Sequence, residues 1–98
     1  MPHFVTLIQW TDQGIRNVRE SPKRAEAARK LAKDLGGNLS LWYTQGEYDI
    51  VGISEFPSDE AYMQFALQSG SLGNIRTKTL KAWSEAEATQ LIAKVRQV

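Results

Sequence analysis

Cysteine is absent from this 98-residue sequence, and its absence excludes several kinds of chemistry at once. A chain without thiols forms no disulfide, carries no thiolate nucleophile and cannot hold a metal or an iron–sulfur cluster through sulfur. The lack of cysteine also fits a reducing compartment, so we expect a cytoplasmic protein. Histidine occurs once, as His3, and Glu55 is the one carboxylate that we expect near it. Since a metal site needs more ligands than this pair, we expect none.

Excess charge of one sign is also missing. Lysine and arginine total 12 against 11 acidic residues, a net charge of +1, so no broad basic surface is available to nucleic acid or to an anionic membrane. No apolar run approaches the length of a membrane span, and the first ten residues lack the basic region of a signal peptide. Gly70 and Gly73 stand in a glycine-rich segment without the lysine of a phosphate-binding loop. We therefore expect neither nucleic acid, membrane nor cofactor as a partner.

What the sequence does contain is a regular alternation of strand and helix patterns within one domain, residues 1–98. Apolar spacing predicts strands at residues 3–10, 38–44, 48–56 and 75–83, and helices that begin near residues 22, 59 and 85. Ser21 is expected to cap the first of these helices, with Pro22 at its first position. Ser84 and Glu87 have the spacing of a capping box for the last helix.

This order of elements has few compact solutions. Two right-handed split βαβ crossovers give an α+β, ferredoxin-like fold, βαββαβ plus a C-terminal helix, with an antiparallel four-stranded sheet of strand order 4-1-3-2. The helices would cover one face of this sheet. If Val51 and Ile53 pointed toward the helices, the other face would be a mixture of polar and apolar side chains: Thr6, Ser40, Gly52, Ser54, Arg76, Lys78, Leu80 and Ala82. We expect a second subunit to cover that face.

In this strand order, one edge of the sheet gathers the end of the first strand, the hairpin and the start of the fourth strand. Polar and aromatic residues that are distant in sequence would meet there, as in a small polar ligand site. They are Trp10, Asp12, Gln13, Glu47, Tyr48, Asp49, Asn74 and Arg76. The same residues also suit ordinary turns, and an ion pair between Asp49 and Arg76 would be structural in most proteins. Both interpretations stay open.

Three segments at this edge also resemble a known family. Residues 10–14 (Trp-Thr-Asp-Gln-Gly), Gly46 with Tyr48 and Asp49, and residues 73–77 (Gly-Asn-Ile-Arg-Thr) look like the GYD-domain family. Glu47 separates the glycine from the tyrosine of the motif here. The resemblance implies a dimeric α/β-barrel assembly of ferredoxin-like subunits, while the family name describes a motif and not a reaction.

Three functions are compatible with these observations. The first is a homo-oligomer, a dimer or alternatively a trimer or larger assembly, that senses a small polar or anionic ligand through Trp10, Asp12, Gln13, Tyr48, Asp49, Asn74 and Arg76. The second is an interaction or assembly subunit for another protein. The third is a cofactor-independent enzyme of the dimeric α/β-barrel type, with Asp49 as the base and Tyr48 as the proton donor. We rank them in that order.

Overall fold

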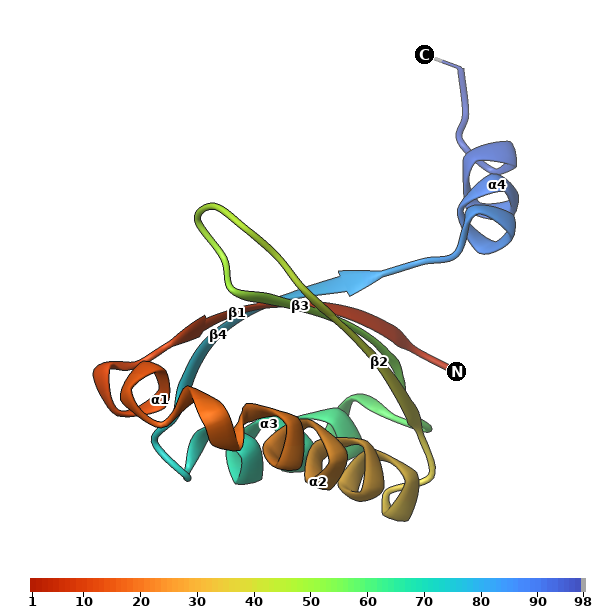
Figure 1. Ribbon diagram of the computed structural model, residues 1–98. Coiled ribbons are helices and arrows are strands. Elements are labelled where there is room, and N and C mark those ends of the chain that lie inside the picture. The colour runs from red at the N-terminus through yellow and green to blue at the C-terminus, as the bar shows by residue number, and fades with distance from the viewer. Residues whose placement is uncertain (98) are drawn as a thin grey trace.

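A computed structural model, which describes residues 1–97, shows a sheet whose one face is covered by helices (Figure 1). The strands are β1 (His3–Trp10), β2 (Asn38–Tyr43), β3 (Ile50–Glu55) and β4 (Ile75–Ala82). The helices are α1 (Asp12–Arg16), the 3-10 turn η1 (Val18–Glu20), α2 (Ser21–Asp34), α3 (Asp59–Gly70) and α4 (Glu85–Ala93).

The sheet has the topology expected from the sequence. Its strand order is β2-β3-β1-β4 and every neighbouring pair is antiparallel, which confirms the ferredoxin-like α+β fold. The sheet arches over α2 and α3, whereas α4 projects away on the opposite side (Figure 1). The face that α2 and α3 cover is called the helix side below, and the other is called the open face.

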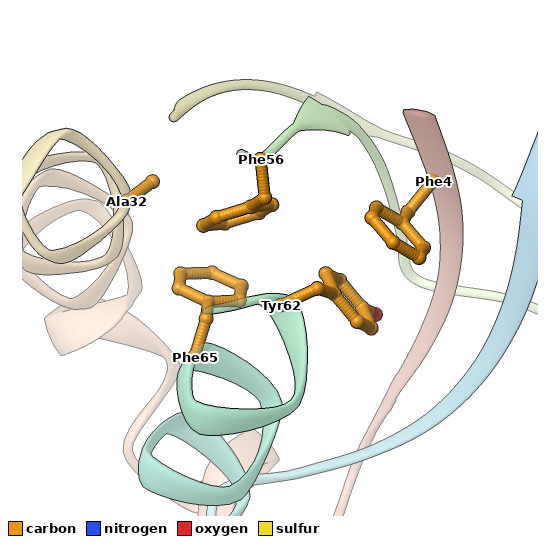
Figure 2. Close-up of a cluster of buried hydrophobic side chains, with 5 residues drawn as sticks. All are labelled: Phe4, Ala32, Phe56, Tyr62 and Phe65. Atoms are coloured by element: carbon orange, nitrogen blue, oxygen red, sulfur yellow. The ribbon is translucent and has the colours of Figure 1, made fainter. Parts of the chain in front are cut away.

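The core is aromatic and lies at one end of the helix side. Phe4, Phe56, Tyr62 and Phe65 are buried there together with Ala32 (Figure 2). The rings of Phe4 and Tyr62 stack with centroids 4.0 Å apart, and Phe56 lies edge-on to both. Aromatic pairs at such distances contribute about 0.5–1.5 kcal/mol beyond their buried area. This cluster therefore fixes α3 against β1.

The register of β3 differs from our expectation. Residues paired directly across antiparallel strands share a face, and Phe4 pairs with Ser54 while Thr6 pairs with Gly52. Because Phe4 is in the core, Gly52 and Ser54 face the helix side. The expectation that Val51 and Ile53 point toward the helices was therefore wrong, as was the placement of Thr6 on the other face. Ile50 lies on the helix side and Ile53 on the open face. Both alternating sets of residues in this strand therefore contain apolar side chains, and the sequence does not show which set faces the helices.

Element ends also needed correction. Glu20, and not Ser21, is the N-cap of α2, because Ser21 already has the backbone angles of a helix (φ −55°, ψ −42°). The Ser21 hydroxyl is buried and lies 2.8 Å from that of Tyr43. β3 starts at residue 50, two residues later than expected. Helix α3 runs through Gly70, two residues into the loop that we expected at residues 69–74. Helix α4 stops at Ala93 and leaves out Val95, which we expected as the last residue of its apolar stripe. The capping box of Ser84 and Glu87 is confirmed.

Candidate functional site

The edge of the sheet that we singled out is held together by backbone hydrogen bonds between distant segments. The amide of Asp49 donates to the carbonyl of Ile8 over 2.9 Å, and that of Thr11 donates to the carbonyl of Asn74 over 3.0 Å. The Thr11 hydroxyl donates to the carbonyl of Gly73 as well, over 2.6 Å. The end of β1 is thus joined on one side to the β2–β3 hairpin and on the other to the α3–β4 loop.

Asp49 supports this junction with its side chain. Its Oδ2 accepts a hydrogen bond from the backbone amide of Trp10 at 2.9 Å, in a half-buried position. A carboxylate that accepts from a backbone amide makes one of the stronger kinds of hydrogen bond. Tyr48, also half-buried, accepts at its carbonyl from the Thr44 hydroxyl, which closes the hairpin. Both proposed catalytic residues therefore have a structural task at this edge.

Gln13 and Asn74 are paired with each other. The Gln13 amide group donates to Asn74 Oδ1 at 2.9 Å and to the carbonyl of Leu72 at 3.1 Å. Gly14 follows directly and is buried, and a Cβ at this glycine would overlap the carbonyl oxygen of Asn74. Asp12 is exposed at the start of α1, where the side chain of Thr11 caps the helix. The first turn of α1 thus fits tightly against the α3–β4 loop.

Arg76 lies at the same edge without the partner that we expected. Among residues 1–97 no ion pair joins it to Asp49, whose carboxylate binds the backbone instead. Arg76 pairs in register with Gln9 on the open face, and its side chain is exposed. Trp10 is half-buried, 6.3 Å from the ring of Tyr43. The predicted residues are therefore brought together as a group, and the side chains of Gln13, Asp49 and Asn74 are engaged in hydrogen bonds that join its segments.

The open face carries a feature that the sequence did not reveal. Its central positions are apolar and form two adjoining rows across the sheet. Trp42, Val51 and Leu7 form one row, and Ile53, Val5 and Leu80 form the other. We call these six residues the open-face patch. Trp42, Ile53 and Leu80 are 66%, 49% and 54% exposed.

Helix α4 extends the apolar surface beyond the sheet. It leaves β4 on the open-face side and does not pack on α2 or α3 (Figure 1). Leu91 and Ile92 on α4 are mostly exposed, as is Trp83 before it. The apolar stripe that the spacing of Ala88, Leu91, Ile92 and Val95 predicts is present except for Val95, which lies beyond the helix, and it has no partner among the described residues of the chain.

His3 lies between α4 and a carboxylate of the sheet. Its Nε2 lies 3.3 Å from Glu55 Oε1, as expected, and its Nδ1 lies 3.3 Å from Glu87 Oε1, a neighbour that we missed. The pKa of Glu87 is lowered, first by the hydrogen bond from the Ser84 amide and then by the Ser84 hydroxyl. In the part of the chain that the structure describes, no group of three or more histidine or acidic side chains could hold a metal ion.

Comparison with known proteins assigns the chain to a family. The sequence model of the GYD domain matches residues 4–92. The chain belongs to the GYD-domain family. A relative from Thermus thermophilus, named glutamine synthetase and cystathionine beta-lyase binding protein, is 31% identical over 98 residues, which cover 98% of this chain and all of the relative. No solved structure matches the chain significantly.

The motif of this GYD domain can now be placed. Gly46, with a φ of +113°, lies at the exposed tip of the hairpin, and Asp49 ties the base of the hairpin to β1. In this chain the motif thus builds a junction between segments. Sequence analysis did not identify four residues that matter in the structure. Thr11 and Gly14 belong to residues 10–14, which resemble the family motif, but they were not picked out as site residues. Trp42 and Val51 were recognised only as parts of predicted strands.

None of the helices within residues 1–97 has both the length and the apolar character that a membrane span requires.

Proposed function

We propose that this GYD-domain protein is a homodimer that works by binding other proteins, and that its two copies pair through the open-face patch. The observation that carries the proposal is the patch itself, six neighbouring apolar residues on a sheet face that no helix of the described residues 1–97 covers. Contiguous exposed apolar surface of this kind marks interaction sites in soluble proteins.

A second copy of the chain is the occupant that fits best. In a twofold dimer the same patch lies on both partners, so an apolar patch meets an equally apolar one. Helix α4 projects on the open-face side, where a second copy would sit, so its exposed Leu91 and Ile92 would gain a surface to pack on. This arrangement agrees with the dimeric α/β-barrel assembly that the family resemblance implied. A trimer or a larger ring is the alternative assembly.

The binding of other proteins is supported by the relative from Thermus thermophilus, whose name describes it as binding glutamine synthetase and cystathionine beta-lyase. We propose enzymes of this kind as the first partners to test for the present chain. A cytoplasmic location is part of the proposal, because the absence of cysteine fits a reducing compartment.

Two matched isoleucines test the dimer. Ile53 and Ile15 are 49% and 48% exposed, but Ile15 lies on α1, away from the open-face patch. Burial of a half-exposed isoleucine in each copy contributes about 2–3 kcal/mol per dimer, and a glutamate there would add an unpaired buried charge. Ile53→Glu should therefore raise the dimer dissociation constant by about 100-fold or more, while Ile15→Glu leaves it unchanged.

The measurement is sedimentation equilibrium on the wild type and both variants, with circular dichroism to show that each is folded. Binding to immobilised glutamine synthetase and cystathionine beta-lyase is then compared for the three proteins. A wild type that remains an 11.0 kDa monomer at every concentration would contradict the homodimer, and binding to neither enzyme would contradict the proposed partners.

A small polar or anionic ligand at the sheet edge is the second candidate function. Arg76 favours it, because its exposed guanidinium takes part in no ion pair among residues 1–97. Titration of inorganic phosphate, followed by amide shifts of Asn74 and its neighbours, tests this in the wild type and in Arg76→Ala. Catalysis with Asp49 as base is the third candidate. It would be supported by any turnover that Asp49→Asn abolishes in a folded protein.

A further inference from the structure

A cavity of about 300 Å³ lies on the helix side of the sheet, between the strands and helices α2 and α3. Its walls are largely apolar, with Ile8 and Ile50 from the sheet and Leu31 and Phe65 from the helices among them. Small-molecule sites usually have volumes of about 300–1,000 Å³, and an apolar cavity of about 150 Å³ already binds benzene. This cavity can therefore hold a molecule of one or two fused rings.

Small residues in the walls leave room for this empty volume. Gly52 on β3 and Ala25, Ala28 and Ala66 on the helices all line it. Gly52 does not have a positive φ, and a Cβ there would meet methyl groups of Leu39 and Leu41 at 3.4 Å, which is an ordinary contact. The backbone thus does not require glycine at this strand position, where glycine weakens a sheet. Both the glycine and the unfilled space lower the stability of the fold. Such a cost is expected where a bound ligand fills the space.

A line of hydroxyl groups supplies a polar contact in this apolar wall. The Thr6 hydroxyl lies 2.8 Å from that of Tyr62, which lies 2.6 Å from that of Thr79. Thr6 and Tyr62 are 8% and 7% exposed, and both line the cavity. Three hydroxyls carry three donor hydrogens, and their two mutual hydrogen bonds use only two. One hydrogen is left over, and in two of the three donor arrangements it belongs to Thr6 or Tyr62.

The cavity is reachable from solvent near the edge of the sheet. Exposed residues of α3, the α3–β4 loop and β4 form part of its wall, namely Gln68, Ser71, Leu72 and Thr77. Trp10 and Asn74, two of the residues that the sequence singled out, also line it. A ligand would thus enter beside the α3–β4 loop.

We propose that this cavity binds a small, largely apolar ring compound that carries one hydrogen-bond acceptor, with Thr6 and Tyr62 as the donors. The proposal goes beyond protein binding and is independent of it, because the cavity and the open-face patch lie on opposite sides of the sheet. It also differs from the edge site, whose ligand would be polar or anionic.

The probes are 2-naphthol and naphthalene, which differ by one hydroxyl group. The wild type should bind 2-naphthol saturably, with shifts in the methyl signals of Ile8, Leu31 and Leu39 and none in those of Ile53 and Leu80. The double variant Thr6→Val, Tyr62→Phe keeps the shapes of both side chains and removes both donors. It should lower the ratio of 2-naphthol affinity to naphthalene affinity by about tenfold, which corresponds to the largest contribution expected from one neutral hydrogen bond.

Gly52→Val fills the cavity and should abolish binding of both probes, while Ser40→Val adds the same side chain on the open face and should leave binding intact. If Gly52→Val does not fold, Gly52→Ala should still weaken binding of both probes. The proposal is overturned if the wild type shows no saturation up to the solubility of the probes, if the shifts fall on the open-face patch, or if the double variant Thr6→Val, Tyr62→Phe leaves the affinity ratio unchanged.

Discussion

Replacement of Gly14 by alanine tests whether the motif segments at the sheet edge form a tight junction. Gly14 is buried in α1, and a Cβ on it would overlap the backbone carbonyl of Asn74. Because this neighbour is backbone and not a flexible side chain, the α3–β4 loop must move away. The hydrogen bonds from Thr11 to Asn74 and Gly73, and those from Gln13, depend on the present position of that loop.

Each of these hydrogen bonds contributes about 1 kcal/mol to the free energy of unfolding. Alanine has a higher helix propensity than glycine, which offsets about 1 kcal/mol of the loss. The free energy of unfolding of Gly14→Ala should therefore be lower by about 2–3 kcal/mol. Gly70→Ala is the matched control. Gly70 ends α3 with no atom within 4 Å of its would-be Cβ, so this change should raise stability by about 0.5–1 kcal/mol.

Urea denaturation followed by tryptophan fluorescence measures both variants, and hydrogen exchange of the Thr11 amide reports on the junction itself. We expect faster exchange of this amide in Gly14→Ala and wild-type exchange in Gly70→Ala. Equal stability of the two variants, with the Thr11 amide protected in both, would refute the reasoning.

Two further predictions concern buried and capping groups. The Ser54 hydroxyl is buried with no hydrogen-bond partner among residues 1–97, so Ser54→Ala should raise the free energy of unfolding by about 1 kcal/mol in urea denaturation, and a loss of stability would contradict this. The lowered pKa of Glu87 means that its contribution to α4 is complete above pH 4.5 and is lost as the pH falls through the lowered pKa. The Ser84 amide shift should follow this loss in the wild type and in Glu85→Gln, but not in Glu87→Gln, and a Ser84 amide that does not titrate would disprove the cap.

Most of the fold could be predicted because several local signals agree. Apolar alternation placed the strands, the Ser84 capping box placed α4, and handedness reduced the strand orders to the one observed. The orientation of β3 could not be read in the same way. Ile50, Val51 and Ile53 place apolar side chains on both faces, so only pairing with β1 decides that Gly52 faces the helix side.

The candidate site also has parts that the sequence predicts and parts that it does not. Strand order was enough to bring Trp10, Asp49 and Asn74 to one edge, because it depends on topology alone. The partner of Asp49 could not be predicted, since a backbone amide leaves no trace in the sequence. The cavity was also invisible, because it arises from residues that are small and not from residues that carry chemistry.

The two binding surfaces proposed here can be separated by single substitutions, because they alternate along one strand. Ile53 points to the open face and Gly52 to the cavity, and each residue is flanked by neighbours of the opposite orientation. A charge at position 53 would therefore enter the proposed dimer interface without lining the cavity, and a larger side chain at position 52 would fill the cavity without entering that interface. Ile53→Glu should dissociate the dimer and still bind 2-naphthol, while Gly52→Val should do the reverse. If both variants lost both properties, the two surfaces would be coupled through β3, and assembly and ligand binding would be one function.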